Sequence, residues 1–142
     1  SLDDYENLSD KCKPKLSDIL FSKTGSIGHC ALVETSKAFA ISQNTARLSF
    51  NTSIINSTYA LHYLRSIAIQ VLSKRSAKGN AVKDLQLGKM KKFPFPLPPL
   101  SLQKKFTSNI FEIEKIKIKY KDSLKKIDQL LKAFTNKSFI RN

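Results

Sequence analysis

The chain of 142 residues lacks several features that assign a sequence to a common protein class. It has no run of roughly eighteen apolar residues, so we expect no transmembrane helix. Its first ten residues are acidic and polar, which does not fit a signal peptide. The two cysteines, Cys12 and Cys30, form neither a C-x-x-C motif nor a disulfide-rich pattern. We therefore expect free thiols in a reducing cytoplasm.

Residues that carry catalysis or hold a metal ion are equally scarce. The two histidines have no paired carboxylates nearby, and there is no G-x-S-x-G motif. The segment 23–28, Lys-Thr-Gly-Ser-Ile-Gly, lacks the final G-K-S/T of a P-loop. The cysteines and histidines have the chemistry of zinc ligands, but their positions are scattered. We expect a protein that is not an enzyme and uses no metal or cofactor.

Acidic residues are few beside basic ones. Lys and Arg total 25 against 11 Asp and Glu, which gives a formal net charge of +14. A surface this basic usually contacts a polyanion, and a ribosomal or merely soluble basic protein is the alternative. Residues 21–92 carry eleven basic and two acidic side chains, a net of +9, whereas residues 1–20 carry a net of −2. We therefore expect nucleic acid to contact residues 21–92.

Short apolar runs separated by polar turns predict strands in the first part of the chain. Runs at 18–22, 29–33 and 38–41 each have the length of a strand, and residues 45–50 alternate apolar with polar side chains. Such strands favour a mostly antiparallel sheet. Residues 1–15 show no apolar periodicity and contain a proline, so we expect them to be irregular.

The period changes after Asn56, which is a suitable N-cap. Apolar residues then recur at helical spacing towards Ser76 and predict one helix that packs on the sheet. Its stripe comprises Ala60, Leu61, Leu64, Ile67, Ala68, Val71 and Leu72. After this helix, the residues from Val82 to Leu87 predict a short extended or turn segment.

Four of the five prolines lie within six positions of the segment 93–100, FPFPLPPL. Proline fixes φ at about −65° and removes a backbone donor, so we expect a stiff, extended connector. Residues 101–139 contain no glycine or proline, and nine positions there follow an unbroken 4-3 spacing. Lys117 occupies one of them and would set register or orientation. The other eight form an apolar seam that predicts a coiled coil with a partner helix: Phe106, Ile110, Ile113, Tyr120, Leu124, Ile127, Leu131 and Phe134.

These patterns predict an α+β fold: a small, mostly antiparallel sheet with one packed helix, then a long C-terminal coiled-coil helix. The glycine pair in segment 23–28 has two interpretations. A Gly-x-x-Gly clamps the nucleic-acid backbone in KH domains, but between helices rather than strands. A hairpin turn whose glycines permit positive φ is the other.

Together the segments resemble the DNA-specificity subunits of type I restriction-modification systems. In that family an I-P-L-P-P-L-x-E-Q element ends a target recognition domain and begins a spacer helix. Leu102 stands where the family usually has Glu. The family also has a further strand-rich portion before the equivalent of Asp18, and two domain–helix repeats. The resemblance spans about residues 15–140 and rests on 18–28, 41–44, 59–72, Gly79-Asn80 with Leu85, and above all 93–103.

The resemblance implies that residues 1–92 form a partial target recognition domain and residues 93–142 a proline hinge and coiled-coil spacer helix. It implies a non-catalytic subunit that reads double-stranded DNA through the major groove. Methyltransferase (modification) subunits would then flip and methylate an adenine, and a restriction subunit would act through them. The chain would be a fragment, a truncated reading frame or a half-subunit that pairs as a homodimer or with a second spacer helix.

Candidate DNA contacts are loop residues with basic, amide or hydroxyl side chains, which bond to phosphates and base edges. Among them, Gln43 and Asn44 suit adenine and Arg75 suits guanine. Ordinary solvated loop residues are the alternative, and the two cations at the end of the helix also suit its dipole. The candidates are Lys23, Thr24, Ser26, Ser42, Gln43, Asn44, Lys74, Arg75, Lys78 and Asn80.

Two other classes of function stay open from the sequence. One is a basic protein that binds nucleic acid without sequence preference. The other is a coiled-coil oligomerisation adaptor whose excess of lysine keeps it in solution.

Overall fold

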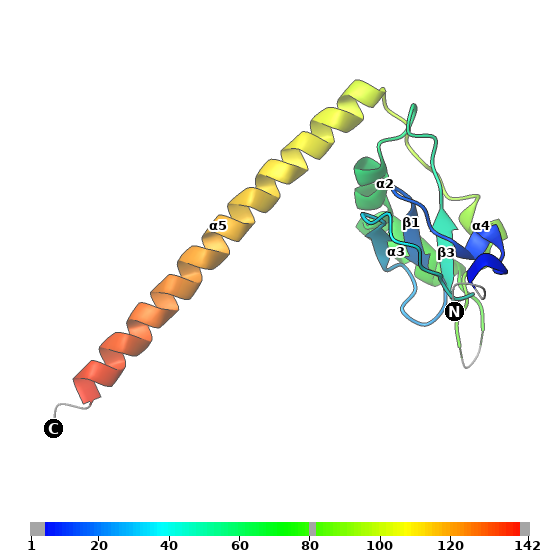
Figure 1. The fold of residues 1–142 in the computed structure, drawn as a ribbon. Helices are drawn as coiled ribbons and strands as arrows, with labels where there is room; N and C mark the ends of the chain where they lie inside the picture. The colour runs from blue at the N-terminus through cyan, green and yellow to red at the C-terminus, as the bar shows by residue number, and fades with distance from the viewer. Residues whose placement is uncertain (1–4, 80–81, 140–142) are drawn as a thin grey trace. The chain divides into compact units, whose positions relative to one another are not determined.

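The computed structural model describes residues 5–79 and 82–139. The chain divides into two compact units, Ser1–Lys104 and Lys105–Asn142. The first unit holds a small sheet and several helices, and the second holds most of the long helix α5, Leu100–Phe139 (Figure 1). The predicted α+β class is confirmed. No helix in the described part of the chain is long and apolar enough to cross a membrane.

Strand β1 (Ile19–Ser22) is the centre of a three-stranded antiparallel sheet with the order β2-β1-β3. It pairs on one side with β2 (Cys30–Leu32) and on the other with β3 (Thr45–Leu48). Alternate residues of β1 point to one face, where Ile19 and Phe21 are fully buried. The strands predicted at 18–22, 29–33 and 45–50 are therefore confirmed.

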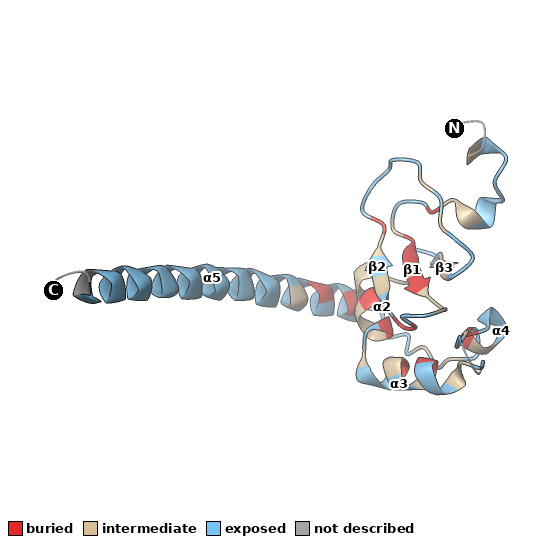
Figure 2. Ribbon diagram, turned by 90° about the horizontal axis from the view of Figure 1, so that it is seen from below, coloured by how far each residue is buried: buried red, intermediate tan, exposed pale blue. Residues whose placement is uncertain are grey.

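Three helices follow the sheet: α2 (Ser57–Leu64), α3 (Ile67–Ser76) and the short α4 (Leu87–Met90). Helix α2 begins as predicted, because Asn56 Oδ1 accepts a hydrogen bond from the N–H of Tyr59 at 2.9 Å. The buried residues, red in Figure 2, gather where the helices meet the sheet. The core contains Ile19, Phe21, Ile27, Ala46, Ala60, Leu61, Leu64, Ile69, Leu85 and Met90.

The strand predicted at Ala38–Ile41 is wrong. This segment is irregular and has no buried residue, and the N–H of Ile41 donates to the carbonyl of Cys12 at 2.9 Å. Arg47 of β3 also donates to the N-terminal segment, from Nη1 to the carbonyl of Asp10 at 2.9 Å. The N-terminal segment, with its short 3-10 helix η1 (Asp10–Cys12), therefore supplies the partner for Ile41 in place of a fourth strand.

The single helix predicted up to Ser76 is in fact two helices. The chain leaves helical geometry at Ser66, where ψ is 149°. Gln70 donates from Nε2 to the carbonyl of Leu64 at 2.8 Å and so satisfies an oxygen at the end of α2. Because the break changes the buried face, Ile69 is 1% exposed while Ile67, a member of the predicted stripe, is 83% exposed. Helix α4 was also not predicted, because the segment reaching Leu87 was expected to be extended or a turn.

Residues 94–99 of the proline-rich connector lie in neither a helix nor a strand, and two tyrosines of α2 bind this segment. The hydroxyl of Tyr63 donates to the carbonyl of Pro94, and that of Tyr59 donates to the carbonyl of Pro96 at 3.0 Å. The ring of Phe95, between these prolines in the chain, lies with its centroid 5.0 Å from that of Tyr63. The connector therefore follows a defined path along α2.

Gln103 fixes the first turn of α5. Its side chain is fully buried, and Oε1 accepts from the N–H of Asn56 at 2.8 Å. Its Nε2 donates to the carbonyls of Ile54 and Pro98, at 3.0 and 2.8 Å. One amide thus joins the loop before α2, the end of the connector and the start of α5.

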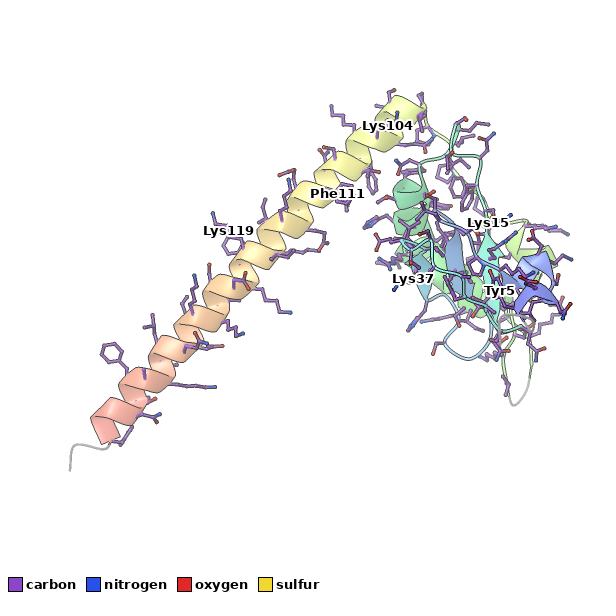
Figure 3. All side chains as sticks on the ribbon, viewed as in Figure 1. Tyr5, Lys15, Lys37, Lys104, Phe111 and Lys119 are labelled. Carbon is purple, nitrogen blue, oxygen red and sulfur yellow. The ribbon has the colours of Figure 1, made fainter. Side chains whose placement is uncertain are left out.

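Helix α5 has 40 residues, so the long helix predicted over 101–139 is confirmed. Side chains such as Phe111 and Lys119 project from it (Figure 3). Two ion pairs of i,i+3 spacing lie on its surface, Lys115 with Glu112 and Lys117 with Glu114, each at 2.7 Å.

We expect Gln103→Leu to lower the free energy of unfolding by about 2–4 kcal/mol, because it leaves one N–H and two carbonyls without partners. Urea denaturation of the full chain measures this. Lys104→Leu is the control, because the side chain of Lys104 is next to Gln103 in the chain and is exposed. That control is expected to stay within about 0.5 kcal/mol of the parent chain. Equal losses in the two variants would contradict the role assigned to the amide.

Candidate nucleic-acid interface

The segment 23–28 is the turn that joins β1 to β2. Gly25 and Gly28 have φ of 72° and 98°, in the left-handed region that favours glycine. The hairpin-turn interpretation of the glycine pair is therefore confirmed. The turn carries three of the predicted contacts, and of these Ser26 is exposed to solvent.

The other two, Lys23 and Thr24, bind an acidic side chain of the same unit. Lys23 Nζ lies 3.0 Å from Asp84 Oδ1, and the hydroxyl of Thr24 donates to the same oxygen. The hydrogen bond from Thr24, and then that from Lys23, hold the pKa of Asp84 below its usual value. Asp84 is therefore ionised at neutral pH and compensates the charge of Lys23.

The predicted contacts Ser42, Gln43 and Asn44 form an exposed loop that leads into β3. The carbonyl of Asn44 accepts from the N–H of Lys23 at 2.9 Å, which ties this loop to the turn. Within the loop, the N–H of Asn44 donates to Ser42 Oγ at 3.3 Å. A hollow of about 360 Å³ has Lys23, Ser42 and Gln43 among its lining residues. The turn and the loop are thus neighbours.

The third group lies at the end of α3 and beyond it. Lys74 and Arg75 are exposed in the last turn of α3. Lys78 exchanges two backbone hydrogen bonds with Asp84, at 3.0 and 2.8 Å. Asn80 lies outside the described residues. The structure therefore brings Lys78 to the turn through Asp84, and it places Arg75 on α3 only.

Sequence reasoning missed two residues at this place, His29 and Lys83. Both line a hollow of about 340 Å³ together with Ser26 and Lys74. None of the described residues that line it is acidic. The sequence pattern predicts a strand at His29 and a connecting segment at Lys83, and it indicates neither residue as a surface group. The basic excess of residues 21–92 was the one available signal for Lys83.

The Cys30 thiol does not have the character of a reactive thiol. Both cysteines are free, and Cys30 Sγ donates to the carbonyl of Gly28 at 3.0 Å. Burial raises the pKa of Cys30 to about 11, so this thiol stays protonated. Among residues 5–79 and 82–139, no group of three or more His, Cys, Asp or Glu side chains is placed to hold a metal ion.

The chain matches the family described as the type I restriction modification DNA specificity domain over residues 1–132, and it therefore belongs to that family. This confirms the resemblance based on the proline element and extends it to the first residues. A search of curated proteins found no match. The family assigns the chain to specificity rather than to catalysis.

The two glycines of the turn are expected to differ in their tolerance of alanine. A Cβ on Gly28 would lie 2.3 Å from Gln70 Oε1, and the Gln70 amide is held by the carbonyls of Gly28 and Leu64. We expect Gly28→Ala to cost about 2–4 kcal/mol of unfolding free energy, measured with urea.

Gly25→Ala is the matched control. A Cβ on Gly25 meets no atom within 4 Å, so only the backbone strain of its positive φ remains, about 1 kcal/mol. Equal losses from the two substitutions would mean that the contact between Gly28 and Gln70 does not fix the turn.

Proposed function

We propose that this chain recognises a specific DNA sequence for a type I restriction-modification system through one face of its first unit. This face, called the reading face below, consists of the turn 23–28, the loop 42–44 and the segment 74–79. One observation carries the proposal: these segments are distant in sequence, yet hydrogen bonds around Lys23 and Asp84 fasten the turn to the other two. Family membership supplies the DNA ligand.

The side chains of the reading face divide into two kinds. Cations such as Lys74, Arg75 and Lys78 would bond to phosphates and set the orientation of the protein, and Arg75 also suits guanine. The amides of Gln43 and Asn44 would read base edges, with adenine the best match for a bidentate amide contact. Ser26 and Ser42 would add polar contacts, and Asn80, which lies outside the described residues, would add another. Lys23 and Thr24 would shape the turn that carries them.

The proposed role in the assembly is recognition alone. Modification subunits would methylate adenine in the recognised sequence, and a restriction subunit would join through them. The chain itself would supply no catalytic group. The cytoplasm, where the DNA that such a system would act on lies, is the proposed location.

Helix α5 would join the chain to a second helix, from another copy or from a second spacer helix. From Ile113 onward its seam residues are exposed within the chain, for example Leu124 at 62%, Leu131 at 62% and Phe134 at 69%. Apolar residues at a and d positions need a partner helix to bury them. Lys117, which pairs with Glu114, would restrict the register of that pairing.

Selection from random duplexes, with modification subunits added, tests sequence recognition. We expect an enriched consensus and an affinity for random duplex that falls steeply as salt rises. Binding without any consensus would support the nonspecific basic protein instead. Absence of DNA binding would support the oligomerisation adaptor.

Lys74→Gln tests the reading face. It removes one phosphate contact, so the slope of log affinity against log salt is expected to become shallower by about 0.9. Lys119→Gln, at an exposed position of α5, makes the same change of charge at a residue that does not belong to that face. Equal slopes in the two variants would contradict the placement of DNA on the reading face.

Leu124→Asp with Leu131→Asp tests the seam of α5. Two carboxylates at a positions are expected to abolish self-association or docking of a partner helix, as measured by sedimentation. DNA binding by the first unit should survive in a weak form. The control, Gln129→Asp with Asn136→Asp, adds the same charge outside the seam. An unchanged mass of the seam variant would contradict the coiled coil.

A further inference from the structure

Asp84 is one of only two acidic residues between positions 21 and 92, and it lies where the basic segments meet. A carboxylate in a surface that binds phosphate opposes that binding, because like charges repel. Its Oδ1 accepts hydrogen bonds from Lys23 Nζ, at 3.0 Å, and from the hydroxyl of Thr24. Its backbone exchanges two hydrogen bonds with Lys78. Every one of these bonds reaches a residue of the reading face.

We propose that Asp84 is a positioning residue that fixes the geometry of the reading face and withholds the charge of Lys23 from the DNA backbone. This inference rests on the proposed function. The side chain of Lys23 is 20% exposed and that of Asp84 is 41% exposed, so the pair lies at the boundary between core and surface. While the pair is intact, its net charge is zero.

The pair is joined to the core on one side and to the loop on the other. Leu85, next to Asp84, is fully buried, and its N–H donates to the carbonyl of Lys23 at 2.8 Å. The N–H of Lys23 donates to the carbonyl of Asn44 at 2.9 Å. Lys23 is therefore connected by its main chain to the loop that carries the amides, and by its side chain to Asp84.

This arrangement separates specificity from affinity. Base reading requires that Gln43 and Asn44 keep a fixed position relative to the cations of the face. Phosphate attraction depends mainly on the number of cations that reach the backbone. Asp84 is expected to improve base reading and to reduce phosphate attraction.

Asp84→Asn therefore should have two opposite effects. The amide is close in shape but has no charge, so Lys23 becomes available to a phosphate. Affinity for random duplex should rise, and its salt slope should steepen by about 0.9. Discrimination between the selected sequence and random duplex should fall roughly tenfold, the size of one lost base contact.

Two further variants isolate the cause. Glu34→Gln makes the same change of charge at the other acid of this region, which is exposed and outside the pair. It should change neither the slope nor the discrimination. The double variant Asp84→Asn with Lys23→Gln should return the slope to that of the parent chain, while discrimination stays low. A role of Asp84 in stability alone would not produce this reversal.

The outcomes distinguish this inference from the proposed function. If the parent chain selects no consensus, the proposed function fails, and the salt slopes on random duplex still test the withheld charge. If a consensus exists but Asp84→Asn behaves like Glu34→Gln, the inference about Asp84 fails.

If Asp84→Asn does not fold, as judged by circular dichroism, Lys23→Gln decides. An unchanged slope supports a lysine that is withheld from DNA. A slope that is shallower by about 0.9 overturns the proposal, because Lys23 would then already contact a phosphate.

Discussion

A buried amide must have partners for both its donors and its acceptor, and this constraint determines how the connector and the first turn of α5 meet the rest of the first unit. Gln103 meets it with three bonds, to residues before α2, at its N-cap and within the connector. The tyrosines of α2 hold the connector at two further carbonyls. Prolines cannot donate backbone hydrogen bonds, so the carbonyls of this segment are what the other side chains bind.

Some charged groups of the first unit are likewise paired within the unit. Of the basic residues between 21 and 92, Lys23 pairs with Asp84, and Arg47 lies 3.6 Å from the carboxylate of Asp18, which is itself 5% exposed. These cations hold loops in place. A formal net charge therefore overstates the charge that a polyanion can reach, because it counts structural and exposed cations alike. Some of the excess basic residues therefore keep loops ordered and do not bind a polyanion.

Much of the fold followed from local sequence patterns. Glycines between two apolar runs predicted the β1–β2 turn, Asn56 predicted the start of α2, and the absence of glycine and proline predicted α5. The errors came from tertiary contacts. The break at Ser66 is stabilised by Gln70, a polar side chain whose helical position gives no sign that it reaches Leu64 and Gly28. The segment 38–41 is hydrogen-bonded to the N-terminal segment. The N-terminal segment has no apolar periodicity, so the sequence pattern does not predict this contact.

At the candidate site too, sequence patterns do not predict tertiary contacts. Residue type and loop position selected Ser42, Gln43, Asn44 and the cations of α3, and each of these is exposed. Sequence alone did not distinguish Lys23 from Lys74, because what separates them is a carboxylate 61 positions away from Lys23. Pairing across such a separation depends on how Leu85 enters the core. A surface lysine and a structural lysine look identical until that packing is known.

The two units differ in how far contacts among their own residues can stabilise them. The first unit buries an apolar core, whereas residues 105–139 present seam residues such as Leu124 and Phe134 to solvent. Pairs such as Lys115 with Glu112 contribute only about 0.2–0.5 kcal/mol each to an isolated helix. Most helical stability in proteins comes from packing an amphipathic face. In the proposed pairing, order in this part of α5 is coupled to association, so a partner helix would stabilise the segment that it binds.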